Sequence, residues 1–132
     1  MFTKKHWGNY AWGFLDAVVL TYPAKPSSQE KQNYRTFFTS LQSILPCPMC
    51  RDHYAQNLKK YSLDQGLESR EHLIRWLTDV HNSVNVANGK RKLSYKEARA
   101  CMEGKFQFTA YHGAGIILIL VLMFFLSRKL KI

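Results

Sequence analysis

The sequence predicts an all-α protein with one helical domain and a C-terminal membrane helix. Apolar residues recur at three- and four-residue spacing through the first hundred residues, and no stretch shows the alternation of a half-buried strand. Proline, serine and glycine interrupt these stretches at positions typical of helix ends. A chain of 132 residues with 46% hydrophobic residues is long enough for one folded domain and too short for a two-domain enzyme.

The first two helices are predicted on either side of a proline-containing loop. The first helix is expected to end at Pro23. Its apolar stripe consists of Trp12, Leu15, Val18, Val19 and Tyr22. Ser27 and Glu30 have the spacing of a capping box, which begins the second helix. That helix is expected to end at Pro46. Its apolar stripe consists of Tyr34, Phe37, Phe38, Leu41 and Leu45.

The remaining helices complete a predicted four-helix bundle with a short fifth helix. Pro48 is placed to begin the third helix, because proline is favoured at the first helical position. A polar loop is expected at residues 64–66, before a fourth helix that starts near Ser69 and ends with Gly89 as a left-handed cap. Ser94 and Glu97 begin the fifth helix, which is expected to end near residue 103.

The C-terminal stretch predicts a membrane anchor. Residues 106–126 hold no formally charged side chain and would span about 31 Å as a helix. Tyr111 suits one membrane interface, and Arg128, Lys129 and Lys131 suit the other. The alternative is a buried core helix. We therefore divide the chain into a domain (1–105), a transmembrane helix (106–127) and a short basic tail (128–132), as in a single-pass protein anchored at its C-terminus.

The charge of the chain narrows the range of partners. The formal net charge is +10, and residues 1–105 carry seven of these charges. A basic domain can meet nucleic acid, an anionic lipid surface or a phosphate-bearing cofactor. No nucleic-acid motif accompanies the charge, so we predict no nucleic-acid partner and a mostly solvated basic surface.

The sharpest chemical motif is Cys47-Pro-Met-Cys50 at the predicted start of the third helix. A helix N-terminus stabilises a thiolate, which makes these residues a candidate redox dithiol. The same spacing also occurs as half of a zinc site, so a membrane-tethered zinc-binding interaction module is the alternative reading. Such a site would need Cys101 or histidines as further ligands. A thioredoxin-like fold is disfavoured because its βαβ context is missing.

A second motif lies on the fourth predicted helix. His81 and Asn85 are four residues apart and share one helix face, with Asn82 and Val84 beside them. Two such side chains could bracket a flat polar ring, although taken alone the motif is better explained as two ordinary polar helix positions. A basic run begins after Gly89. Near the N-terminus, two tryptophans flank a glycine, and these tryptophans could form a stacking slot or simply pack in the core.

Taken together, these features resemble the FAD-linked sulfhydryl oxidases of the Erv/ALR type. The elements occur in that family's order: a tryptophan helix ending in Tyr-Pro, then Pro-Cys-x-x-Cys, then His-Asn-x-Val-Asn followed by Gly-Lys. The similarity covers roughly residues 6–100. The small size and the single Cys-x-x-Cys are similar to the short viral members.

The resemblance implies a helical bundle that holds FAD and forms a homodimer. It implies that Cys50 lies beside the flavin and that Cys47 exchanges with substrate thiols. The implied cofactor-binding residues are Gly8, Trp12, Asp16, His81, Asn82, Val84, Asn85 and Lys90. It further implies a thiol-bearing protein substrate or a thioredoxin-like relay partner, molecular oxygen as final acceptor with hydrogen peroxide as product, and a host or virion membrane as location.

This sequence departs from the family pattern at three places. Asp16 stands where many members have histidine. Thr78 and Tyr95 stand where cellular members have a second disulfide, so that covalent brace is absent. Cys101 has no second cysteine near it in the sequence, which leaves a free thiol or a link between subunits as its expected states.

Overall fold

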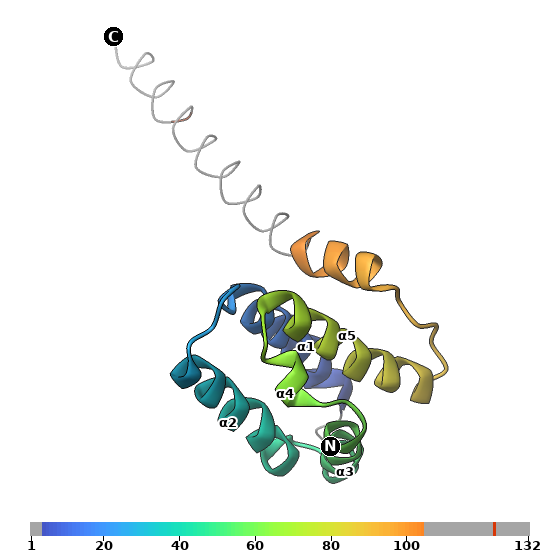
Figure 1. Ribbon diagram of the computed structural model, residues 1–132. Coiled ribbons are helices and arrows are strands. Elements are labelled where there is room, and N and C mark those ends of the chain that lie inside the picture. The colour runs from blue at the N-terminus through green and yellow to red at the C-terminus, as the bar shows by residue number, and fades with distance from the viewer. Residues whose placement is uncertain (1–3, 105–122, 124–132) are drawn as a thin grey trace. The chain divides into compact units, whose positions relative to one another are not determined.

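Helices are the regular secondary structure of the part of the chain that the structure describes. The structure is a computed structural model that describes residues 4–104 and 123. Its helices are α1 (Lys4–Thr21), α2 (Ser28–Ile44), α3 (Pro48–Lys60), α4 (Leu63–Gly66) and α5 (Arg70–Ala87) (Figure 1). A sixth helix follows over residues 95–104, and no strand occurs among the described residues. The all-α prediction is therefore confirmed.

Helix starts follow the predicted capping signals closely. The Ser27 hydroxyl accepts from the Glu30 N–H at 3.2 Å, and the Glu30 carboxylate accepts from the Ser27 N–H at 2.7 Å. Pro48 occupies the first turn of α3, and Ser69 caps α5. Gly89 takes the left-handed conformation after α5, with φ of +70°. The serine N-caps Ser27 and Ser69 each stabilise their helix by about 1 kcal/mol.

One sequence prediction is wrong. The loop expected at residues 64–66 is the single-turn helix α4, capped by the Ser62 hydroxyl, which accepts from the Gln65 N–H. Its first residue, Leu63, is buried. Gly66 lies so close to Trp76 that a Cβ there would come within 2.9 Å of the tryptophan Cβ. A helix of four residues has no apolar period, so tertiary packing decides its conformation.

The mostly aliphatic core also contains buried aromatic side chains, and the hydroxyls of its tyrosines are hydrogen-bonded. Phe38 is fully buried and meets the ring of Trp76 edge to face. The Tyr22 hydroxyl donates to the Leu67 carbonyl at 2.8 Å, and the Tyr54 hydroxyl donates to the Phe38 carbonyl at 2.9 Å. Burying these rings therefore leaves no phenol unsatisfied, and it fixes α1 and α3 relative to the rest of the bundle.

Polar contacts hold the helix of residues 95–104 against α5. The Tyr95 hydroxyl lies 3.0 and 3.1 Å from the two Asp79 carboxylate oxygens, and the Arg75 guanidinium lies over the Tyr95 ring. Further along, Glu71 pairs with both Arg75 and Arg99. Tyr95, one of the two positions at which the family's second disulfide was expected to be absent, therefore contacts α5 non-covalently.

Glu97 should make the stability of this last helix depend on pH. Hydrogen bonds from Arg91 and then from the Ser94 N–H and hydroxyl lower the pKa of Glu97 to about 2 from 4.5. Its stabilising contribution is therefore present above about pH 4.5 and is lost as the pH falls through about 2. We expect the difference in urea midpoint between wild type and Glu97→Gln to shrink steadily across that range. A difference that stays constant with pH would contradict this.

Apart from residue 123, the membrane helix predicted at residues 106–127 lies outside the described residues. Among the residues that are described, no helix is both long and apolar enough to cross a bilayer. The chain divides into two compact units, Met1–Met102 and Glu103–Ile132. The site described next belongs to the first unit.

Candidate functional site

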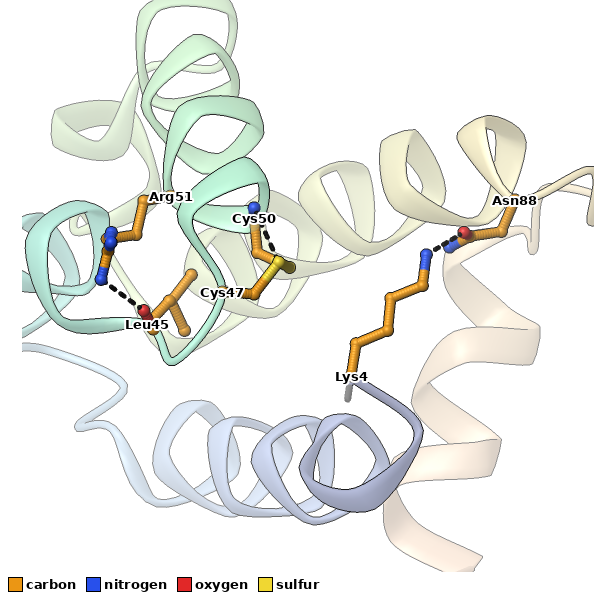
Figure 2. Close-up of a disulfide and its surroundings, with 6 residues drawn as sticks. All are labelled: Lys4, Leu45, Cys47, Cys50, Arg51 and Asn88. Atoms are coloured by element: carbon orange, nitrogen blue, oxygen red, sulfur yellow. Dashed lines mark hydrogen bonds between the residues drawn. A yellow bond between two sulfur atoms is a disulfide. The ribbon is translucent and has the colours of Figure 1, made fainter. Parts of the chain in front are cut away.

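The two motif cysteines form a disulfide at the start of α3. Cys47 and Cys50 are joined, with their Cα atoms 5.1 Å apart, and both residues are half-buried (Figure 2). Cys47 is the N-cap of α3, and its Sγ accepts a hydrogen bond from the Cys50 N–H at 3.2 Å. The local sequence explains this geometry, because Pro48 begins the helix and places Cys50 one turn inside it.

The N-terminal end of α3 favours a thiolate at Cys47. Once the disulfide opens, the same N–H donor and the positive end of the helix dipole would stabilise negative charge on that sulfur. Arg51, which the sequence analysis missed, donates to the Leu45 carbonyl at 3.0 Å and holds the segment that leads into the motif (Figure 2). The position of Arg51 directly after the second cysteine was the only signal for it.

A ring stack joins α1 to α5. The rings of Trp12 and His81 are nearly parallel, with 3.8 Å between their centroids and 4° between their planes. Both side chains are half-buried, and Asp16 lies one turn further along α1 with only 2% of its surface exposed. The structure therefore brings together the tryptophan and the histidine that the sequence singled out separately.

Gly8 lies one turn before Trp12 on α1, where the surface is open. A Cβ built at Gly8 would meet nothing within 4 Å. Packing among the described residues therefore gives no reason for a glycine, which costs about 1 kcal/mol relative to alanine inside a helix. Close approach of a bound group would give one. This open surface beside flat aromatic rings fits a cofactor with a flat ring system, such as FAD.

Asn82 serves the fold directly. Its side-chain amide donates to the Leu93 carbonyl and accepts from the Leu93 N–H, both at 2.8 Å. These bonds hold the chain that returns after α5, and Asn82 is only 8% exposed. A cofactor contact for Asn82 stays a prediction. Of the other expected cofactor residues, Val84 and Asn85 are half-buried and Lys90 is exposed.

Replacing Asn82 by alanine should destabilise the domain. The substitution removes two hydrogen bonds and leaves the backbone N–H and carbonyl of Leu93 without their partner, so the expected cost is about 1–3 kcal/mol. Chemical unfolding of wild type and Asn82→Ala measures it. Ser83→Ala, a neighbouring half-buried position on α5, is the control with little expected effect. Equal midpoints for Asn82→Ala and wild type would contradict the structural role of Asn82.

The described residues contain no group of three or more histidine, cysteine, aspartate or glutamate side chains that could hold a metal ion. The described part of the chain thus offers the zinc alternative no ligand set. Cys101 is exposed and forms no disulfide in the structure.

Comparison with known sequences gives a consistent family. The profile of the Erv1 / Alr family matches residues 9–107. A protein of Acanthamoeba polyphaga mimivirus, named a "Probable FAD-linked sulfhydryl oxidase", is 46% identical over 102 residues, which cover 76% of this chain and 71% of that protein. An Arabidopsis thaliana FAD-linked sulfhydryl oxidase is 36% identical over 88 residues, covering 67% of this chain but only 45% of the plant protein.

Solved structures agree with the sequence comparison. The crystal structure of the yeast Erv1 core matches with a TM-score of 0.71 and 27% identity, covering 77% of this chain and 85% of that one. The FAD binding domain of Erv1 from Saccharomyces cerevisiae matches with a TM-score of 0.69 and 28% identity, covering 74% and 91%. With its helical bundle and its Cys-x-x-Cys disulfide, this chain belongs to the Erv1/Alr family.

Proposed function

We propose that this chain is an FAD-dependent thiol oxidase that forms disulfide bonds in protein substrates and passes the electrons to molecular oxygen, giving hydrogen peroxide. The observation that carries the proposal is the Cys47–Cys50 disulfide at the start of α3. It occurs in a chain whose relatives are named FAD-linked sulfhydryl oxidases. The substrate is a thiol-bearing protein or a thioredoxin-like relay partner.

All the residues proposed to hold FAD except Lys90 lie on two helices. Gly8 and Trp12 lie on α1, and His81 and Asn85 lie on α5, joined through the ring stack. Four further side chains complete the proposed set, at positions where the family resemblance predicts contacts: Asp16, Asn82, Val84 and Lys90. When bound, FAD supplies the two-electron acceptor for the reduced cysteine pair.

The proposed cysteine chemistry takes Cys47 as the sulfur that exchanges with substrate, as the family resemblance implies. A substrate thiolate attacks Cys47 Sγ, the bond between the two cysteine sulfurs breaks, and Cys50 leaves as a thiolate. A second substrate thiolate then attacks the substrate sulfur of the mixed disulfide, which releases Cys47 as a thiolate. The substrate pair has lost two electrons to form its disulfide, and the cysteine pair has gained them. The N–H donated to Cys47 Sγ lowers the cost of the charge on this sulfur.

We assign the chain to a homodimer on the strength of an exposed aromatic face. Tyr10 is 81% exposed and Phe14 is 59% exposed, one turn apart on α1. Phe14 meets Phe37 of α2 edge to face, which extends the apolar surface across two helices. Large exposed aromatic side chains in a cluster mark protein contacts. Light scattering on the purified chain should give twice the monomer mass, and a monomer would contradict the assignment.

The proposed location is a host or virion membrane, with residues 106–127 as the anchor. The support is the uncharged run of this segment and the basic residues that follow it. The full chain should stay with membranes after extraction at alkaline pH, whereas a chain that stops at residue 105 should not. Release of the full chain by alkaline extraction would contradict the anchor.

Oxygen consumption tests the proposed reaction. The purified chain, given a small dithiol, should consume oxygen and produce one peroxide for each disulfide formed. A folded, flavin-bound chain that consumes thiols without oxygen uptake would show that another acceptor takes the electrons. A folded chain that consumes neither would contradict the proposed function.

A further inference from the structure

Two contacts join the N-terminal half of α1 to the C-terminal half of α5. One is the stack of Trp12 on His81. The other lies eight residues earlier on α1, where the Lys4 ammonium donates to the Asn88 side-chain oxygen at 2.8 Å (Figure 2). Because Lys4 pairs with Asn88 and Trp12 pairs with His81, the two helices run antiparallel. Eight residues correspond to about 12 Å of helix between the two contacts.

Gly8 lies midway between these contacts. Lys4, Gly8 and Trp12 follow one another at four-residue spacing and therefore share one face of α1. The antiparallel register places Asn85 opposite Gly8, between His81 and Asn88 on α5. Gly8 is also where a Cβ would meet nothing within 4 Å. The two helices are thus in contact at Lys4–Asn88 and at Trp12–His81. Between these two contacts, the surface of α1 at Gly8 is open.

The acceptor of the Lys4 contact is held in place by the end of α5. The Asn88 side-chain nitrogen donates to the Val84 carbonyl at 2.9 Å, which directs the amide oxygen away from the helix end. The Asn88 backbone N–H bonds to the carbonyls of Val84 and Asn85, and Gly89 then turns the chain in the left-handed conformation. The carbonyl end of a helix carries partial negative charge, which also favours the Lys4 ammonium there.

The donor side of the same contact lies at the surface. A lysine side chain carries four rotatable bonds and Lys4 is exposed, so the net gain from the contact is modest, about 0.5–1.5 kcal/mol. The stack at Trp12 is half-buried and lies next to the buried Asp16. The Lys4 contact is therefore the more exposed of the two contacts.

We propose that the Lys4–Asn88 hydrogen bond is a strap that closes the outer end of the cofactor site and slows the release of FAD. The inference rests on the proposed function, because it takes FAD as the group between the two contacts. Lys4 is a positioning residue: it acts through Asn88 on the spacing of α1 and α5 and takes no part in the cysteine chemistry. Flavin release is therefore the property that it controls.

The test measures flavin release from the full-length, flavin-bound chain as the rise of free-flavin fluorescence after dilution. Lys4→Met should release flavin about two- to tenfold faster, as expected from the loss of one surface hydrogen bond. Asn88→Ala should do the same, and the double variant should be no faster than the faster single variant. Asn88→Asp keeps an acceptor for Lys4 and should release flavin no faster than wild type. Lys25→Met, an exposed lysine beyond the other end of α1, is the matched control and should leave the rate unchanged.

Each other outcome overturns a definite statement. Lys4→Met with the wild-type release rate overturns the strap while the proposed function stands. Rates that multiply in the double variant show that Lys4 acts independently of Asn88, for example on a cofactor phosphate, and also overturn it. A wild-type chain that folds and binds no flavin overturns the proposed function itself, and the strap with it.

Discussion

Replacing Cys50 by serine should lower the oxidation of a small dithiol by at least about a thousandfold and leave FAD bound. A hydroxyl cannot replace the sulfur in the Cys47–Cys50 bond, so the variant has no disulfide for a substrate thiolate to open. Apart from Lys90, which follows α5, the residues proposed to hold FAD lie on α1 and α5, whereas Cys50 lies in the first turn of α3. The rate of thiol loss and the ratio of flavin to protein test the two halves of this prediction together.

Cys101 supplies the matched control for this experiment. It is exposed and outside the disulfide, so Cys101→Ser should keep its oxidation rate within about twofold of wild type. Turnover that survives in Cys50→Ser would contradict the assigned role of Cys50. A comparable loss in Cys101→Ser would show that the third cysteine takes part in electron transfer.

Replacing Trp12 by alanine should weaken flavin binding by about ten- to a hundredfold. Stacking of a flat ring on an aromatic side chain contributes about 1–3 kcal/mol, and the substitution also removes the support of Trp12 for the His81 ring. The measurement is the dissociation constant of FAD for the flavin-free protein, obtained from quenching of flavin fluorescence.

The conservative variant Trp12→Phe separates stacking from simple folding. It keeps an aromatic face beside His81 and should retain most of the affinity, whereas alanine should not. The unfolding midpoint of each variant without FAD checks that both remain folded. If Trp12→Ala, folded, binds FAD as tightly as wild type, the ring stack does not form part of the cofactor site.

Local sequence signals predicted most of the helices because the interactions that begin and end them are local. Ser27 with Glu30, Pro48 and Gly89 each act within a few residues of their own position, and the structure places each as expected. The exception is α4, whose conformation depends on the fit of Gly66 against Trp76. Gly66 and Trp76 are ten positions apart in the sequence, and the apolar pattern of a single helical turn cannot predict a contact between them.

The site shows the same limit over longer separations. The spacing of the α5 motif placed His81 and Asn85 on one face, but nothing local could indicate that Trp12 stacks on His81 or that Asn82 holds Leu93. The Lys4–Asn88 contact joins residues 84 positions apart. Such pairings depend on the antiparallel packing of α1 on α5, which the long-range contacts of the whole core determine.

The central claim is that Cys47 and Cys50 exchange electrons with a bound FAD, and an anaerobic titration tests it most directly. The purified full-length chain should be yellow, with about one FAD per protein. A small dithiol, added without oxygen, should bleach the flavin absorption in wild type and leave it unchanged in Cys50→Ser. A colourless folded protein, or a flavin that the dithiol bleaches equally well in Cys50→Ser, would contradict the account.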